Sequence, residues 1–194
     1  MKLVIRVKLL PTPEQATALQ ATLHACNAAA NHVSHTAFTT GTKRNRELRA
    51  LTYTHLKTRW ALGSQAAQHV IKKTADAYAA LTGNLKAGNL GKPGSTRFRR
   101  APEKPIAFRP QGAQPYDDRM LSWQMPQRTV SIRTVAGRKK RLAFTGEETQ
   151  LLLLTHHRQV EHADLNASHV IAGRGWWMWV CGAESQVPAL TLIA

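Results

Sequence analysis

The sequence predicts an α+β protein, in which different stretches of the chain form helices and a sheet. Three observations support this fold class. Apolar residues alternate with charged ones over 3–9, recur every three or four positions between 16 and 85, and return in short alternating segments between 119 and 145. Hydrophobic residues make up 43% of the 194 residues, which is enough for a folded core.

A strand and a long helix are predicted at the start of the chain. Apolar residues at 3, 5, 7 and 9 alternate with basic residues at 2, 6 and 8, which predicts a half-buried strand. The basic face of this strand either contacts phosphates or is simply exposed to solvent. Thr12 is a good N-cap, Pro13 suits the first helical position, and Gln15 completes a capping box. An apolar stripe that includes Cys26 then predicts a helix over 13–38.

Two more helices and a basic linker are predicted next. The second helix covers about 44–62, and Ser64 is expected to cap a third helix whose apolar residues extend to Leu85. The stretch 88–118 is rich in Gly and Pro and is predicted to be a linker. Within it, Arg97-Phe98-Arg99-Arg100 mixes cations with an aromatic ring, which is typical of a flexible nucleic-acid contact; a soluble loop with incidental charge is the alternative.

Short strands are predicted over about 119–125, 128–135 and 139–145, with a hairpin turn at 135–138. A basic cluster, Arg138 to Arg141, lies on the far side of this turn. Residues 147–154 fit either a helix or a strand. A helix is predicted from Asp164 to Ala172, and the apolar stretch 176–180 fits either a strand or an exposed tail.

The charge distribution narrows the class of partner. Lys and Arg total 27 against 11 Asp and Glu, which gives a net charge of +16. Residues 1–158 carry +18 and residues 159–194 carry −2. So basic a chain attracts polyanions, of which nucleic acid is the commonest and a membrane surface the other candidate. Two cysteines and an N-terminus without a continuous apolar stretch favour a cytoplasmic, nucleoid-associated protein.

Catalytic and metal-binding patterns are sparse. Metal-dependent cleavage of nucleic acid typically needs several converging carboxylates, and Asp164 is the best single candidate. Asp117 and Asp118 are typical of a turn with a local ion pair, and Glu147-Glu148 is typical of a helix start. The spacing of the C-terminal histidines matches no familiar zinc pattern, so no metal site is predicted.

Several segments together carry a family resemblance. They are, in order, 3–15, a helix ending near 31–33, Arg49 to Tyr53, Ile71 to Tyr78, Tyr116 to Trp123, and Val130 to Ile132. Over about 1–158 they resemble TnpB proteins, RNA-guided nucleases encoded by insertion sequences and related to small type V CRISPR effectors. The segment 164–175 is similar to the last nuclease motif of that family.

This resemblance implies a domain organisation. It implies a wedge-type antiparallel β-barrel with an inserted helical recognition domain, plus a short remnant of a RuvC-like domain. The first wedge strand would cover 1–10, the recognition part 11–87, the linker 88–118, the remaining wedge strands 119–158, and the RuvC-like remnant 159–194. These parts would hold a structured guide RNA from the transposon end and target DNA.

The sequence departs from the family in the nuclease region. It contains neither the Asp-x-Gly of the first nuclease motif nor any Cys-x-x-Cys of the zinc finger, and the region of the central catalytic Glu is absent. Asp164 matches the last catalytic Asp without the others. The resemblance therefore implies a nuclease-defective chain that retains neither the Mg nor the Zn site, so no cofactor is expected.

The sequence thus predicts a nucleic-acid-binding, TnpB-like protein that is not an active nuclease. One alternative is a DNA-binding regulator of transposition without a guide RNA; others are a residual metal-dependent nuclease that uses Asp164 and a decayed product that folds poorly. The residues predicted to contact nucleic acid are Arg44, Arg46, Arg49, Lys72, Lys73, Arg97, Phe98, Arg99, Arg100, Arg138, Lys139, Lys140 and Arg141.

Overall fold

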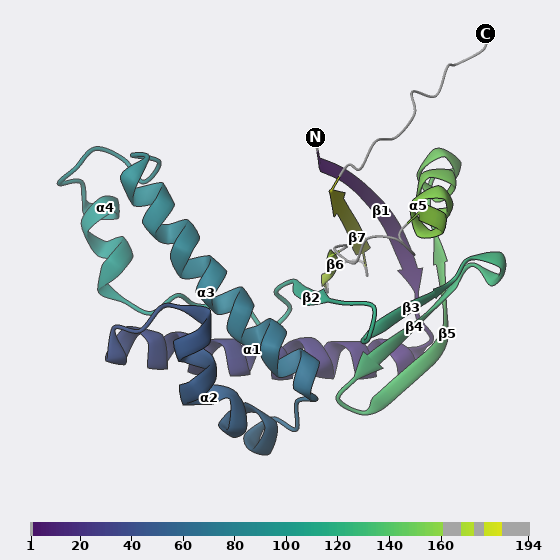
Figure 1. Cartoon of the computed structure of the whole chain (residues 1–194), viewed down its shortest axis with the longest axis horizontal. Helices are drawn as coiled ribbons and strands as arrows, with labels where there is room; N and C mark the ends of the chain where they lie inside the picture. Colours follow the sequence, from purple (N-terminus) through teal and green to yellow (C-terminus); the bar gives the residue numbers. More distant parts are fainter. Residues whose placement is uncertain (1, 161–167, 173–176, 184–194) are drawn as a thin grey trace, which may run out of the picture.

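The computed structural model describes residues 2–160, 168–172 and 177–183. The helices α2 and α3 lie at one end of the molecule, the β-strands lie at the other, and α1 runs from beneath the strands to the helical end (Figure 1). The predicted α+β class is confirmed. Within the described ranges, no helix has both the length and the apolar character that crossing a membrane requires.

The N-terminal elements match their prediction closely. In β1 (Lys2–Leu10), Ile5, Val7 and Leu9 are buried, whereas the basic residues between them are exposed. The helix α1 (Pro13–Thr40) begins with the predicted capping box: the Gln15 backbone N–H donates to Thr12 Oγ1 at 3.3 Å, and the Thr12 N–H donates to Gln15 Oε1 at 3.0 Å. The buried face of α1 includes Cys26, and burial raises the pKa of its thiol to about 12.

Two helices pack on α1. α2 (Asn45–Arg59) stops earlier than predicted because Ala61 adopts a left-handed conformation with φ 49°, which reverses the chain. α3 (Ser64–Lys86) follows at once. The prediction that Ser64 caps α3 is wrong, since Gly63 occupies the N-cap and no side chain caps this terminus. Small buried residues on α1, such as Ala29, Ala30 and Ala37, allow close packing of these helices.

The predicted linker is partly structured. It contains the short helix α4 (Thr96–Arg100), capped by Ser95, and a 3-10 turn over Ala101–Glu103. The following residues cross α1 in an irregular conformation. There, the Asn31 side-chain nitrogen donates to Phe108 O at 3.0 Å, and the Phe108 backbone N–H donates to Asn31 Oδ1 at 2.7 Å.

A second α1 side chain, the buried Asn27, fixes the end of this crossing. Its amide nitrogen donates to Pro110 O at 3.1 Å and to Gly112 O at 2.9 Å, and its oxygen accepts from Lys73 Nζ at 2.6 Å. A Cβ on Gly112 would lie 3.1 Å from Asn27 Oδ1 and 3.0 Å from Arg109 O, so this close approach favours glycine. The chain is therefore held where it enters the sheet.

The sheet is antiparallel and has the strand order β2-β6-β7-β1-β5-β4-β3. Its other strands are β2 (Gln114–Tyr116), β3 (Leu121–Gln124), β4 (Thr129–Thr134), β5 (Gly137–Thr145), β6 (Ser168–Ala172) and β7 (Trp177–Ala183). The three strands predicted between 119 and 145 are present as β3, β4 and β5. A two-residue turn at Val135-Ala136 joins β4 to β5, which confirms the predicted hairpin.

The C-terminal elements correct one prediction and decide two open ones. The helix predicted over 164–172 is wrong for Ser168–Ala172, which form β6 between β2 and β7; consecutive β-branched residues, Val170 and Ile171, suit a strand. Asp164 lies outside the described residues. Residues 148–160 form a helix, α5 (Glu148–Val160), and 177–183 form a strand.

The described pairings leave the sheet open. β2 and β3 stand at the two ends of the strand order, and no pairing among the described strands joins them. A closed wedge-type barrel is therefore not observed in this part of the chain. On the inner face, buried residues of β1 and β5, such as Ile5, Val7, Leu142 and Phe144, share a core with Leu154 of α5.

Replacement of Asn27 tests the attachment of residues 108–112 to α1. Asn27→Ala should lower the free energy of unfolding by about 2–3 kcal/mol, because two carbonyls and the Lys73 ammonium lose their partner in a partly buried site. Asn31→Ala, at an exposed position with two hydrogen bonds, should cost less than about 1.5 kcal/mol. Urea denaturation followed by tryptophan fluorescence measures both; equal costs would contradict this account.

Candidate nucleic-acid interface

The structure separates the predicted basic residues into distinct groups. α4, which carries Arg97, Phe98, Arg99 and Arg100, lies beyond the far end of α3, and strands β3 to β5 lie on the opposite side of the molecule (Figure 1). The three arginines of α4 are exposed, and Phe98 is half-buried. This group is therefore not brought together with the cluster at 138–141.

One basic hollow lies on the outer face of strands β3 to β5. It has a volume of about 610 Å³, and we call it the strand groove. Three cations, three hydroxyls and two amides line it: Arg138, Lys140, Arg141, Ser122, Thr129, Ser131, Gln124 and Gln127.

 Arg138 and Lys140 on β5, and Thr129 and Ser131 on β4, stand at alternate positions and share this face. Arg141 follows Lys140 directly and has a left-handed backbone with φ 55°, which breaks the alternation.

Members of the 138–141 cluster play different parts. Arg138 is fixed, because its Nη2 donates to Arg119 O at 2.6 Å and its Nη1 donates to Ser131 Oγ at 3.3 Å. Lys140 and Arg141 are exposed. Lys139 is turned toward α1, where its Nζ lies 2.6 Å from Glu14 Oε1 and holds the pKa of that carboxyl below its ordinary value.

A second basic hollow, of about 330 Å³, lies between α2 and α3, and we call it the helix hollow. It brings together three of the predicted residues, Arg46 and Arg49 from α2 and Lys72 from α3. Lys72 Nζ also lies 2.6 Å from Asp76 Oδ2. Arg44 is exposed at the start of α2, 3.8 Å from Glu47, and does not line the hollow.

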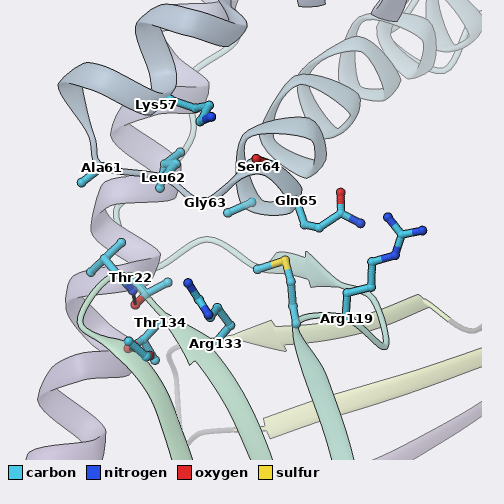
Figure 2. Close-up of a pocket in the computed structure, with 14 residues that line it drawn as sticks. Thr22, Lys57, Ala61, Leu62, Gly63, Ser64, Gln65, Arg119, Arg133 and Thr134 are labelled. Atoms are coloured by element: carbon cyan, nitrogen blue, oxygen red, sulfur yellow. Dashed lines mark hydrogen bonds between the residues drawn. The ribbon is translucent and has the colours of Figure 1, made fainter.

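A third hollow, of about 380 Å³, lies where the helices meet the sheet, and we call it the junction pocket (Figure 2). Its cations were not predicted from the sequence: Lys57 comes from α2, Arg119 from the turn before β3, and Arg133 from β4. Figure 2 shows both arginine side chains rising from the sheet toward the start of α3, with Lys57 on the helical side.

The three hollows adjoin one another. Gln65 lines both the helix hollow and the junction pocket, and the hydrogen bond from Arg138 to Arg119 O links the junction pocket to the strand groove. Together they form a basic track. Nine Lys and Arg side chains line it against one carboxylate, that of Asp117. This imbalance makes the track an attractive surface for a polyanion.

The lone carboxylate has a structural role. Asp117 accepts hydrogen bonds from Gln65 Nε2 at 2.9 Å and from the Met120 backbone N–H at 3.1 Å, and it lies 3.4 Å from His69 Nε2. The predicted turn at this position is therefore present. In the described ranges, no three His, Cys, Asp or Glu residues come together in a way that could hold a metal ion.

The comparisons with known proteins add no family. No protein-family model matches the sequence, and no curated protein gives a significant match.

Lys73 lies outside the three hollows and serves the fold. Its ammonium contacts Asn27 and lies 5.0 Å from the centre of the Phe108 ring. Burial lowers the pKa of Lys73 to about 8 from its ordinary value of 10.5. A half-buried lysine that anchors a loop is a poor partner for a phosphate in solution, in contrast to the exposed Lys72 beside it.

The lowered pKa of Lys73 predicts a pH dependence of stability. Between pH 8 and 10.5 the unfolded chain retains a proton that the folded chain has released, so raising the pH favours the folded state. The free energy of unfolding of the wild type, minus that of Lys73→Met, should therefore increase by about 1–2 kcal/mol across this range, after allowance for partial exposure. Urea titrations at several pH values measure the difference; a difference that stays constant would show that Lys73 titrates normally.

Proposed function

We propose that this protein binds nucleic acid by its phosphate backbone along the basic track. The observation that supports this most directly is the excess of nine cations over one carboxylate in three adjoining hollows. The overall charge of +16 would attract the same partner from a distance. Arginine and lysine neutralise phosphates, and the hydroxyl and amide groups of the strand groove can donate hydrogen bonds to phosphate and sugar oxygens.

The lining of the track favours a structured or double-stranded partner. Proteins that hold single strands stack the bases on aromatic side chains. No Phe, Tyr or Trp is among the residues that line the three described hollows. Helical nucleic acid is instead held by backbone and shape, which polar and cationic side chains can contact.

The resemblance to TnpB proteins refines this proposal. In that reading, the sheet is a wedge-type domain, the helices α1 to α3 form the recognition part, and the partners are a structured guide RNA from the transposon end and target DNA. Asp164 alone matches the catalytic carboxylates of the family, so the proposed protein binds without cutting. RNA that copurifies with the protein from its native locus should then be a discrete transposon-end species.

A charge-matched pair of variants tests the track. Arg46→Gln/Arg49→Gln/Lys140→Gln removes three track cations, and Arg97→Gln/Arg99→Gln/Arg100→Gln removes three from α4. Against the logarithm of salt concentration, the logarithm of the affinity for duplex RNA or DNA falls with a slope of about 0.9 per phosphate contact. The track variant should therefore lower the slope by two to three units and weaken binding more than tenfold.

The α4 variant is the control for a general loss of charge. It should change the slope by less than about one unit, because no residue of α4 lines any of the three hollows. Fluorescence anisotropy across a series of salt concentrations measures both variants, and circular dichroism confirms that they fold. Equal losses in the two variants would reduce the binding to unspecific attraction, and an unchanged slope in the track variant would overturn the proposed surface.

A further inference from the structure

The junction pocket differs from the rest of the track because its cations converge from separate elements. We infer that it seats a single phosphate group, carried by the bound nucleic acid or by a free phosphate anion. In the first case the inference rests on the proposed function and identifies the point at which the nucleic acid is held in register. Lys57, Arg119 and Arg133 are its basic residues, and no carboxylate lines it.

The pairing of β4 with β5 supplies an independent reason. The hairpin register places Arg133 directly opposite Arg138. Residues opposite each other on an antiparallel pair project from the same face, and like charges in that arrangement destabilise the sheet. Arg138 turns toward Arg119 O, whereas the Arg133 guanidinium forms no ion pair among the described residues. An anion in the junction pocket, beside Arg133, would reduce this repulsion.

The pocket is held in shape before any ligand binds. Asp117 fixes the turn that carries Arg119 through Gln65 and Met120 N, and Arg138 binds Arg119 O on the other side. A guanidinium group presents paired N–H donors that match phosphate oxygens, so two arginines that lie on fixed backbone at one pocket can bind a phosphate specifically. Less conformational freedom is then lost on binding.

The start of α3 adds to the same potential. Ser64, Gln65 and Ala66 line the pocket, α3 has no capping side chain, and its first turn contains no acidic residue. The positive end of the helix dipole therefore faces a space that the three cations already make favourable for an anion. A volume of about 380 Å³ falls within the ~300–1,000 Å³ range of small-ligand sites and leaves room for the sugar next to a phosphate.

The first experiment uses inorganic pyrophosphate and the full chain freed of nucleic acid. Titration should shift the backbone amide signals of Ser64, Gln65 and Ala66 saturably in ¹⁵N correlation spectra. Lys57→Gln/Arg119→Gln/Arg133→Gln should weaken this binding at least tenfold, and the α4 triple variant should leave it within twofold. Arg119→Lys/Arg133→Lys, which keeps the charge but loses the paired donors, should recover only part of the affinity.

The second experiment measures the salt dependence of duplex binding by the same variants. Three cations around one phosphate form a single contact, so the pocket variant should weaken binding at least tenfold while lowering the slope by only about 0.9. Three scattered contacts would lower the slope by about 2.7 and would overturn the inference of a single seat. Saturating pyrophosphate should make the wild type behave like the pocket variant.

The outcomes separate this inference from the proposed function. Duplex binding that depends on Arg46, Arg49 and Lys140, without any saturable pyrophosphate titration, would overturn the pocket and leave the track. Pyrophosphate binding that depends on the pocket arginines, in a protein with no affinity for RNA or DNA, would overturn the track and support a seat for a free phosphate anion. Thermal midpoints within a few degrees of the wild type would show that the variants are folded.

Discussion

The buried side-chain amide of Asn27 holds the irregular segment that contains Pro110 and Gly112 against α1. After α4 and the 3-10 turn, the chain returns to the sheet through irregular backbone, whose partly buried carbonyls need donors. Asn27 supplies those donors to Pro110 and Gly112, and Lys73 in turn binds the Asn27 oxygen. Because β2 and the Asp117 turn follow within a few residues, this contact also determines where Arg119 stands beside α3. The position of the candidate site thus depends on a polar contact in the core of the helices.

Electrostatic repulsion within the track acts against the fold. Neighbouring cations such as Arg133 and Arg138 repel each other, and solvent and salt reduce this repulsion without removing it. The protein offsets some of its excess charge elsewhere, through pairs such as Lys139 with Glu14 and Arg128 with Glu148. Among the described residues, Lys72 is the track cation that forms an ion pair, with Asp76. A surface that keeps most of its cations without counter-charges is best understood as adapted to a polyanion.

Local patterns predicted the elements well, and contacts distant in sequence were harder to foresee. The capping box at Thr12, the alternation in β1 and the turn at Val135-Ala136 are all encoded within a few residues. The ordering of 108–112 could not be inferred, because it depends on α1 side chains about 80 positions away. The sequence does not indicate the junction cations, because Lys57, Arg119 and Arg133 come from three segments that are far apart in the chain, whereas the basic residues of α4 form a continuous run. The hairpin turn alone would have placed Arg133 opposite Arg138.

The change in charge near residue 159 does not mark an end of the sheet. β7 pairs with β1 over seven positions, from Lys2 with Ala183 to Lys8 with Trp177, and β5 pairs with the end of β1 from Lys8 to Leu10. β1 therefore has strands on both sides, and one of them comes from the part of the chain that carries no excess of basic residues. The basic residues of the track stand on α2, α3 and strands β4 and β5, with Arg119 in the turn before β3. Charge thus follows the role of each segment: the strands after residue 159 complete the sheet, and the segments before it carry the surface that we propose binds phosphate.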